Sequence, residues 1–202
     1  MSSALSLILA STSPYRRELL GRLRIPFGVV SPEVDETPHE GEAPVRLAAR
    51  LAQAKALAVA STHPDSVVIG SDQVADLDGA AVGKPGTHER AAAQLRAMSG
   101  RAIVFQTAVC VVHAASGFEE ACLVPIEVRF RSLTDGEIEH YLRTEQPYDC
   151  AGSAKVETLG IALLESVRAD DPTALVGLPL IQTCRMLRRA GIDPLRPAGG
   201  HP

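Results

Sequence analysis

The chain has 202 residues, and its 24 acidic residues outnumber its 20 lysines and arginines, which gives a formal net charge of −4. With 46% hydrophobic and 22% charged residues it has the composition of a globular protein large enough to bury a core, so wholesale disorder is excluded. The acidic balance argues against a nucleic-acid coat protein, and the scarcity of aromatic residues (four Phe, three Tyr, no Trp) argues against a platform for stacked bases.

The first part of the chain alternates between predicted strands and helices. Ser13 followed by Pro14 is typical of a helix start, with the serine as N-cap and the proline in the first turn. Apolar residues recur at helical spacing in the second predicted helix. In chain order we expect a strand at 5–10, a helix at 14–23, a strand at 27–31, an acidic loop at 32–44, a helix at 43–61 and a strand at 67–69 that ends at Ser71 and Asp72.

The second part of the chain contains two longer strands that look antiparallel. Thr134 and Glu137 have the spacing of a capping box and predict a helix start. We expect a hairpin at 76–85, a helix at 87–98, strands at 102–114 and 119–131, a helix at 134–143, a polar loop at 146–160, a strand at 161–167 and a helix at 173–190 entered near Pro179. The fold class predicted is therefore α/β, a mixed twisted sheet with flanking helices in one domain of two lobes.

Cysteine usage and the lack of targeting signals predict a soluble, cytoplasmic protein. The four cysteines are scattered and form no C-x-x-C pair, which fits a reducing compartment better than a disulfide framework or a zinc site. The first ten residues lack a basic segment, and no apolar stretch is long enough to span a bilayer. A nucleophilic role for Cys150 stays open, although no neighbouring residue marks it as activated.

The predicted junction between the first strand and the first helix carries hydroxyls and arginines. Ser11 and Ser13 precede the helix, and Arg16 and Arg17 lie in its first turn. A helix N-terminus suits an anion because it presents free N–H groups and the positive end of the helix dipole. The positive charge of an arginine in the first turn opposes the helix dipole, so two arginines there favour an anionic ligand, such as a phosphate, that offsets their charge. The alternative is that Arg16 and Arg17 are both solvated on the surface. Net charge does not exclude such a single phosphorylated ligand.

Carboxylates follow two of the predicted strands. Glu33, Asp35 and Glu36 lie in the acidic loop, where they could converge, and a solvated loop is the alternative. Asp72 comes directly after the apolar run 67–69, at the expected carboxyl end of a strand, where open α/β sheets place their ligands. The alternative for Asp72 is a turn or capping residue. A carboxylate in that position is costly to desolvate, so we expect a metal, a lysine or a catalytic water beside it.

Lysines are rare in this chain, which has only Lys55, Lys84 and Lys155. Lys55 falls on the inner side of its predicted helix, so it either extends past the core to solvent or reaches into a cleft beside carboxylates. Lys84 lies in GAAVGKP, where the glycines are one residue too close for a phosphate-binding loop and a proline replaces the required hydroxyl residue. We therefore reject a P-loop NTPase. The G-x-G-x-x-G, H-E-x-x-H and G-x-S-x-G motifs are absent from the sequence.

Taken together, these residues resemble the Maf-like nucleotide pyrophosphatase family along nearly the whole chain, from about residue 7 to 195. Each matching segment is short, but seven in order at compatible spacing is a specific signal. The segments are LILASTSPYRRELL, PEVDET, LAQAKA, IGSDQV, VGKP, YDCAGSAKVE and LVGLPL. The resemblance implies one Maf-like domain over 1–195, in an elongated ITPase-like fold with a central cleft. A tail at 196–202 is expected to be disordered.

The resemblance also implies an activity, a cofactor and a set of site residues. The activity is hydrolysis of a nucleoside triphosphate to the monophosphate and pyrophosphate, and the cofactor is a divalent cation, Mg²⁺ or Mn²⁺. Asp72 matches the family's proton acceptor and would hold the metal with Glu36. The remaining cleft residues that match are Ser11, Arg16, Lys55 and Lys84, of which the two lysines and the arginine would offset phosphate charge.

Three further positions indicate which base is bound. Tyr15, Gln73 and Glu157 look like the specificity residues of the branch that acts on 7-methyl-GTP, whereas the dTTP and UTP branch typically has Arg and Thr at the first two. A 7-methylguanine carries a delocalised positive charge, which an aromatic face and a carboxylate would both favour. The alternative for Tyr15 is a ring packed over Leu19.

Several other functions stay open at this stage. They are a dTTP/UTP pyrophosphatase of the same family, an enzyme for other damaged nucleotides, a non-catalytic nucleotide-binding regulator of cell division, and a structural protein whose motifs are only turns and caps. The expected partner is a small-molecule nucleoside triphosphate, with no nucleic-acid polymer and no membrane. Base rates favour a homodimer as the assembly.

Overall fold

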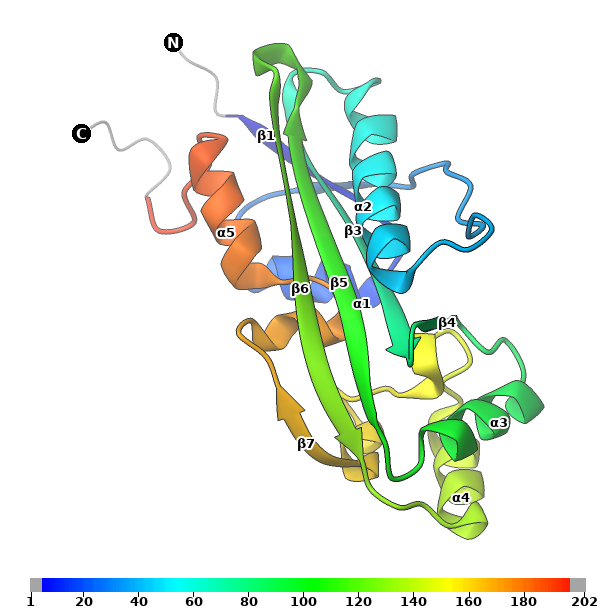
Figure 1. Ribbon diagram of the computed structural model, residues 1–202. Helices are drawn as coiled ribbons and strands as arrows, with labels where there is room; N and C mark the ends of the chain where they lie inside the picture. The colour runs from blue at the N-terminus through cyan, green and yellow to red at the C-terminus, as the bar shows by residue number, and fades with distance from the viewer. Residues whose placement is uncertain (1–4, 197–202) are drawn as a thin grey trace.

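The computed structural model of the protein describes residues 5–196 and confirms the predicted α/β class. Within this range a seven-stranded mixed sheet is flanked by helices, in an elongated molecule with two lobes (Figure 1). The strands are β1 Ser6–Ala10, β2 Gly28–Val30, β3 Ser66–Leu77, β4 Ala80–Val82, β5 Ala102–His113, β6 Phe118–Phe130 and β7 Leu164–Arg168. The α-helices are α1 Pro14–Gly21, α2 Pro44–Ala60, α3 His88–Met98, α4 Asp135–Glu145 and α5 Leu180–Arg189. Short 3-10 turns are η1 Ala114–Ser116, η2 Ala151–Ser153, η3 Leu159–Leu163 and η4 Pro172–Val176.

The sheet changes from parallel to antiparallel at its centre. Its strand order is β2-β1-β3-β5-β6-β7, with β1 parallel to both neighbours and the pairs from β3 to β7 antiparallel. On its β1 side, β3 pairs with β1 as far as Gly70 and with β4 only from Ala75 onward. Among the described residues, the stretch 71–74 therefore has no paired strand along that edge, and this gap is where the chemistry gathers.

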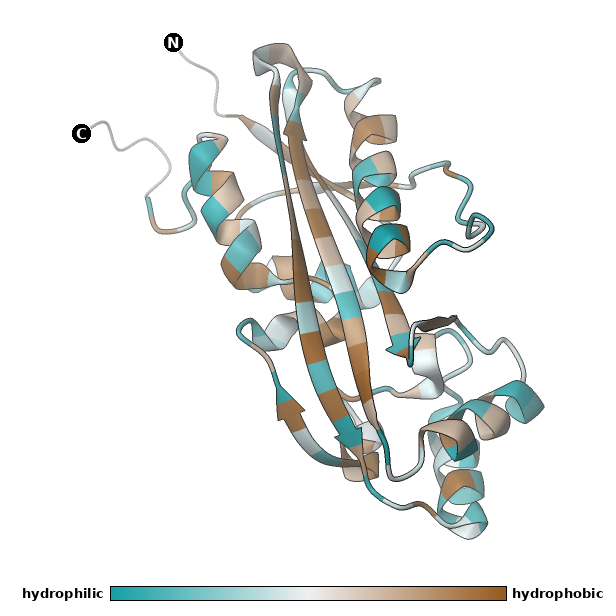
Figure 2. Cartoon of the chain, in the orientation of Figure 1, coloured by the Kyte–Doolittle hydropathy of each residue, from teal (hydrophilic) through white to brown (hydrophobic). Residues whose placement is uncertain are grey.

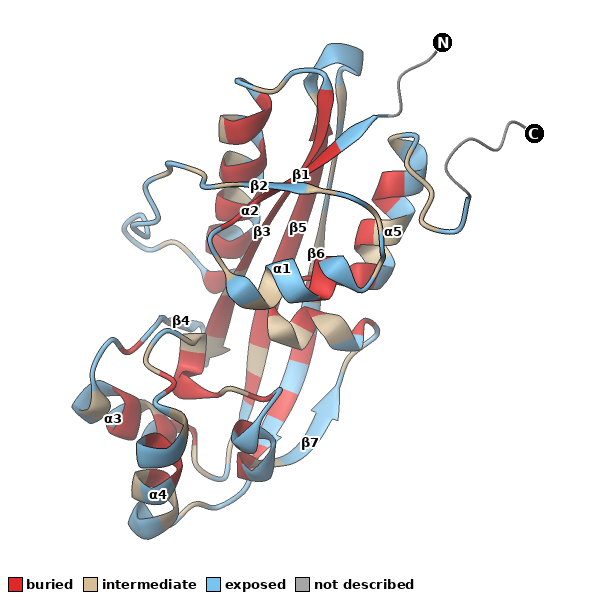
Figure 3. Cartoon of the chain, turned by 180° about the vertical axis from the view of Figure 1, so that it is seen from behind, coloured by how far each residue is buried: buried red, intermediate tan, exposed pale blue. Residues whose placement is uncertain are grey.

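In the upper lobe of Figure 1, helices cover both faces of the sheet. The helix α2 packs on one face, and α1 and α5 pack on the other (Figures 1 and 3). Because both faces are covered, consecutive residues of β3 from Val67 to Ile69 are all buried, which explains the unbroken apolar run in the sequence. The hydropathy colouring shows the same apolar strands at the centre (Figure 2).

The lower lobe is built around the far halves of β5 and β6. Helices α3 and α4 pack there on a second core that includes Phe105, Ile126 and Tyr141. The predicted capping box is confirmed, since Thr134 and Glu137 bond each other's backbone N–H at the start of α4. The long strands β3 and β5 contribute to the cores of both lobes, so the lobes share one continuous sheet.

Three sequence expectations need correction. The strand expected to end at Ser71 and Asp72 continues to Leu77, because β5 keeps pairing with it through the polar residues as far as Asp76. The helix expected at 173–190 is the turn η4 followed by α5, because Gly177 adopts φ +104° and the chain is redirected before α5 begins. The strand expected at 161–167 begins as the turn η3 and becomes β7 only at Leu164.

The tail expected at 196–202 lies outside the described residues except for Arg196. None of the helices in the described range combines the length and the apolar character needed to span a membrane.

Candidate active site

All the predicted site residues line one cavity of about 590 Å³ between the two lobes. It follows the open edge of β3. Its walls come from the N-terminus of α1, the inner side of α2, the loops after β2 and β4, the stretches on both sides of η2, and residues 175–177 at the end of η4. The predicted residues among its lining are Ser11, Tyr15, Arg16, Glu36, Lys55, Asp72, Gln73, Lys84 and Glu157. The structure therefore brings together residues that are far apart in the sequence.

A lysine and two carboxylates form the centre of this cavity. Lys55 Nζ lies 2.7 Å from Asp72 Oδ1 and 2.7 Å from Glu36 Oε1. The Lys55 and Asp72 side chains are buried, with only 6% and 9% of their surface exposed, whereas the Glu36 side chain is 56% exposed. The centre is therefore a buried ion pair that a third, largely exposed carboxylate also contacts. A buried ammonium needs such partners, because an unpaired charge is costly to desolvate.

Local packing explains why Lys55 meets Asp72. A Cβ atom at Gly70 would lie 2.3 Å from the Ala52 carbonyl oxygen and 2.5 Å from the Ala56 nitrogen, so α2 rests directly on the backbone of β3 at this point. Lys55 lies between the two alanines in sequence, and Asp72 lies on the same face of β3 as Gly70, two residues further along. The close approach thus places ammonium and carboxylate side by side.

The loop that carries Glu36 is fastened to α2. Arg50 donates to both carboxylate oxygens of Glu42 at 2.7 Å and to the Thr37 carbonyl at 3.1 Å. Hydrogen bonds from Arg50 and from the His39 backbone lower the pKa of Glu42 to about 2. Burial alone would raise the pKa of Glu36, but the hydrogen bond and charge of Lys55 bring it below its ordinary value. Glu36 is therefore an anion at neutral pH.

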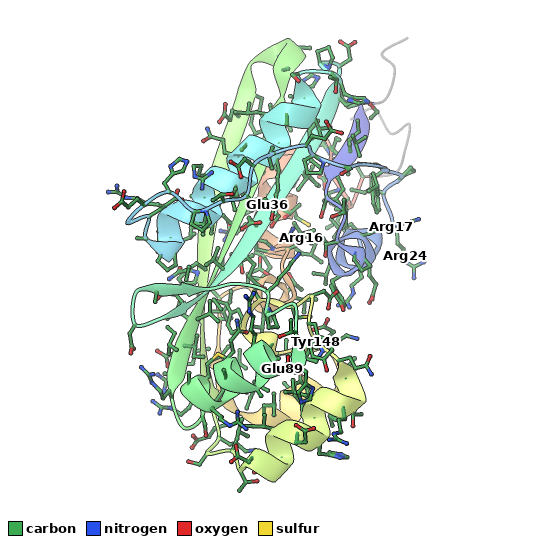
Figure 4. All side chains as sticks on the ribbon, turned by 90° about the vertical axis from the view of Figure 1, so that its right-hand side faces the viewer. Arg16, Arg17, Arg24, Glu36, Glu89 and Tyr148 are labelled. Carbon is green, nitrogen blue, oxygen red and sulfur yellow. The ribbon has the colours of Figure 1, made fainter. Side chains whose placement is uncertain are left out.

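The N-terminus of α1 closes one end of the cavity. Ser13 caps the helix by accepting from Arg16 N, and Ser11 Oγ accepts from Ser13 N at 3.1 Å. The two arginines separate: Arg16 points inward on the side of Glu36, and Arg17 points away (Figure 4). Arg16 Nε donates to the Gly177 carbonyl at 2.9 Å. Burial lowers the pKa of Arg16, while Asp72 and Glu36 act in the opposite direction, and an arginine stays charged.

An aromatic ring and acidic side chains lie close together in another part of the cavity lining. Tyr15, Asp149, Cys150 and Glu157 all line the cavity there. Burial, together with the neighbouring acidic groups, raises the pKa of Tyr15, and burial raises the pKa of Glu157. Lys155 Nζ lies 5.7 Å from the centroid of the Tyr15 ring. The half-buried ring therefore has both an ammonium group and acidic side chains near it.

The thiol that the sequence left open, Cys150, is not activated by its surroundings. Burial and the nearby Asp149 raise the pKa of Cys150 to about 12, so the thiolate form is not populated. The acidic-loop residues Glu33 and Asp35 are exposed, and Asp35 only accepts a turn hydrogen bond from Thr37 N, as the solvated-loop alternative had it.

Sequence reasoning missed the polar groups behind the cavity wall. Gln73 Nε2 donates to Thr107 Oγ1 and to two backbone carbonyls, and Ser71 Oγ lies 2.9 Å from the Gly177 carbonyl. Backbone carbonyls leave no trace in residue types, so no sequence signal could have found these partners. The LVGLPL segment, which includes Gly177, was matched to the family without a role.

Two carboxylates at the centre of the cavity are the candidate ligands for a metal ion. In the described part of the chain no group of three or more His, Cys, Asp or Glu side chains lies close enough to hold one. Glu36 and Asp72 nevertheless offer two carboxylates, each within 2.7 Å of Lys55 Nζ. Mg²⁺ is commonly bound by one or two carboxylates together with substrate phosphates, so the residues fit a cation that arrives with a nucleotide.

Comparison with known proteins shows similarity over nearly the whole chain. The family described as Maf-like protein matches residues 6–190. A 7-methyl-GTP pyrophosphatase of Polaromonas sp. is 67% identical over 196 residues, which cover 97% of this chain and 90% of that protein. Proteins with the same description from Albidiferax ferrireducens and Bordetella pertussis are 64% and 62% identical, over 94% and 97% of this chain and 95% and 96% of theirs. A HAM1 protein from Coxiella burnetii aligns with 63% of this chain and 73% of that chain, at a TM-score of 0.45 and 18% identity.

Proposed function

The chain belongs to the Maf-like protein family, and we propose that it hydrolyses 7-methyl-GTP to 7-methyl-GMP and pyrophosphate, as the names of its relatives suggest. The observation that carries the proposal is the bridge from Lys55 to Asp72 and Glu36 at the centre of the cavity. Binding alone would not require a buried lysine between two carboxylates, whereas hydrolysis of an anhydride requires a proton acceptor and positive charge together.

Asp72 is the proposed acceptor for the proton of the attacking water. Its Oδ1 is held by Lys55 at 2.7 Å, and no hydrogen bond to Oδ2 is formed by the described residues. In the proposed reaction water attacks the α-phosphorus, its proton passes to Asp72 Oδ2, and the bond to the bridging oxygen breaks so that pyrophosphate leaves with its electron pair. The hydrogen bond from Lys55 holds one oxygen of this cavity-lining carboxylate and leaves the other for the water.

Cationic side chains balance the phosphate charge. Arg16 keeps its terminal nitrogens for the ligand, because its Nε is held by the Gly177 carbonyl. Lys84 is exposed at the cavity wall and can follow the leaving pyrophosphate. The hydroxyl of Ser11 and the free N–H groups at the start of α1 add donors for the same charge. Stabilisation of this kind acts most strongly as charge moves to the leaving group.

We propose that Glu36 and Asp72 hold a divalent cation together with the triphosphate. A hard cation prefers oxygen ligands, and these two side chains are the carboxylates beside Lys55. When bound, such a cation polarises phosphoryl oxygens and offsets the charge that develops on them.

The base is proposed to lie between Tyr15, Glu157 and Gln73. A 7-methylguanine is a delocalised cation, which favours the face of Tyr15 and the carboxylate of Glu157. Gln73 Nε2 already serves two backbone carbonyls, so the orientation of its amide is set and Oε1 is the atom left for the ligand. The Gln73 Oε1 atom can only accept hydrogen bonds, and the N1–H and N2–H₂ groups of guanine can only donate them. The free atom of Gln73 therefore matches this edge of the base.

Pyrophosphate release across a nucleotide panel tests the proposal. Wild-type protein is compared on 7-methyl-GTP, GTP, dTTP and UTP, with and without Mg²⁺ or Mn²⁺, alongside Tyr15→Leu and Glu157→Gln variants. We expect 7-methyl-GTP to be the preferred substrate, turnover to need the cation, and both variants to lose preference for the methylated base. A preference for dTTP or UTP would contradict the substrate, and binding without turnover of any nucleotide would contradict the enzyme.

We further propose a cytoplasmic protein that acts on free nucleotides. All four cysteines are free thiols and none forms a disulfide, which suits a reducing compartment. A homodimer is proposed from base rates, and sedimentation velocity would distinguish it from a monomer.

A further inference from the structure

Two predicted site residues are held by the same short stretch of backbone. This stretch is the 172–178 segment, which consists of η4 and the two residues that follow it. Arg16 belongs to the phosphate end of the cavity and Gln73 to the base end, yet both donate hydrogen bonds to carbonyls of this segment. The proposed function assigns no role to the segment itself.

At the phosphate end, the contact point is the carbonyl of Gly177. Arg16 Nε donates to it at 2.9 Å, and Ser71 Oγ lies 2.9 Å from the same oxygen and 2.7 Å from the Ala108 carbonyl. Gly177 has φ +104°, a conformation that L side chains rarely adopt, and a Cβ there would lie 3.4 Å from Arg16 Nε. The glycine therefore lets the carbonyl turn toward Arg16 while the guanidinium packs against the backbone.

At the base end, the contact points are two carbonyls one turn earlier. Gln73 Nε2 donates to the Ala174 carbonyl at 2.9 Å and to the Leu175 carbonyl at 3.0 Å. Thr107 Oγ1 donates to the Ala174 carbonyl at 2.9 Å and is itself 2.9 Å from Gln73 Nε2. These contacts hold the amide in one orientation, because a carbonyl oxygen cannot donate to the amide oxygen.

The segment is tied to the start of α5 by two side chains. Asp171 is 1% exposed, and its Oδ2 accepts from Ile181 N at 2.7 Å and from Gln182 N at 3.2 Å. Thr173 Oγ1 lies 2.9 Å from both Asp171 Oδ1 and the Leu178 carbonyl, and accepts from Leu180 N at 2.8 Å. Thr173 therefore connects Asp171, just before the segment, and Leu178, at its end, to the first residue of α5.

We propose that the 172–178 segment is a positioning element, latched by Asp171 and Thr173, that sets Arg16 for the phosphates and Gln73 for the base at the same time. The inference rests on the proposed function for the roles of Arg16 and Gln73. Asp171 and Thr173 are positioning residues, because they act through backbone carbonyls and do not line the cavity. If the segment were less firmly held, the Gln73 amide could rotate, and selectivity for the base would fall. The Arg16 side chain could also move away from the phosphates, which would weaken their binding.

Equilibrium binding to the full-length protein tests this inference independently of turnover. Dissociation constants of 7-methyl-GMP and dTMP report base selection, and inorganic pyrophosphate reports the Arg16 end. The variants are Thr173→Val, the conservative Thr173→Ser, and Thr183→Val as a matched control. Thr183 also bonds a backbone carbonyl near the start of α5, that of Pro179, but contacts neither Gln73 nor Arg16.

We expect Thr173→Val to lower the affinity ratio of 7-methyl-GMP to dTMP by about tenfold, the equivalent of roughly 1.4 kcal/mol, and to weaken pyrophosphate binding as well. Thr173→Ser and Thr183→Val should stay within about twofold of the wild type, since coupling is expected only where partners are shared. In a Gln73→Leu background, Thr173→Val should no longer change the ratio, because the amide through which it acts is gone.

The inference is overturned if Thr173→Val keeps the wild-type ratio, if Thr183→Val lowers it equally, or if the loss persists in the Gln73→Leu background. These outcomes can be told apart from failure of the proposed function. Wild-type protein that binds selectively but turns over no nucleotide would contradict the enzyme, and the Thr173 variants would still decide the positioning element. Wild-type protein that binds neither nucleotide would contradict both.

Discussion

At the scale of single residues, the position of the Lys55 ammonium determines how the centre of the site is arranged. Its ammonium lies between Asp72 and Glu36, so one buried cation serves two carboxylates. Helical spacing and the apolar run before Asp72 made both residues visible in the sequence, and the acidic loop made Glu36 visible. Their mutual distances were not visible, because they depend on how closely α2 approaches β3.

Replacing Asp72 by asparagine removes the proton acceptor and keeps the shape of the side chain. We expect kcat to fall by about 10²–10⁴-fold, the usual contribution of a positioned general base, while the far-UV circular dichroism stays that of the wild type. The control is Asp65→Asn, an exposed aspartate just before β3. A kcat for Asp72→Asn within about threefold of the wild type would contradict the role given to this carboxylate.

Glu157 links base selection to pH. Burial raises its pKa above the ordinary value of 4.5, so its negative charge is complete only above that raised pKa and is lost as pH falls through it. We therefore expect the kcat/KM ratio of 7-methyl-GTP to GTP to decline on acidification in the wild type. In Glu157→Gln the ratio should be low at every pH, and a ratio that still titrated in this variant would assign the effect to another group.

At the scale of elements, the contact between α2 and β3 sets the geometry of the site. Gly70 lets the two backbones touch, and the small side chains of Ala52 and Ala56 on α2 make room for the strand. The sequence predicted both elements and their inner faces. It did not predict that β3 continues past Asp72, because the polar run from Ser71 to Gln73 looks like the end of a buried strand.

Gly70→Ala tests this contact directly. The added methyl would overlap with backbone atoms of α2 at 2.3 and 2.5 Å, so the helix has to move away and carry Lys55 with it. We expect the free energy of unfolding to fall by about 1–3 kcal/mol or more, and kcat/KM to fall as the Lys55–Asp72 pair lengthens. Gly28→Ala is the matched control, since its Cβ would meet only atoms at 3.9 Å or beyond. Equal effects of the two substitutions would contradict the close-approach explanation.

At the scale of the whole molecule, the cavity exists because the two lobes share long strands. β5 carries Phe105 into the lower core and Val109 into the upper one, and the open edge of β3 lies between them. The α/β class and the mixed sheet could be predicted from the sequence, because segments with strand-like and helix-like patterns alternate along the chain. The split of 173–190 into η4 and α5 could not be foreseen, because it depends on the conformation of Gly177.

Shared strands also predict that the lobes unfold together. We expect a single cooperative transition in urea, with the same midpoint by far-UV circular dichroism and by tyrosine fluorescence, which includes the buried Tyr141 of the lower core. The chain has no tryptophan, so the tyrosine signal is not masked. Separate midpoints for the two probes would show that the lobes are independent.

The most direct test of the central claim is the position of bond cleavage in isotopically labelled water. Wild-type protein is given 7-methyl-GTP and Mg²⁺ in water enriched in oxygen-18, and the products are analysed by mass spectrometry. Because water activated by Asp72 attacks the α-phosphorus, the account predicts the label in 7-methyl-GMP and unlabelled pyrophosphate. Label in the pyrophosphate, release of single phosphate ions, or no turnover would contradict it.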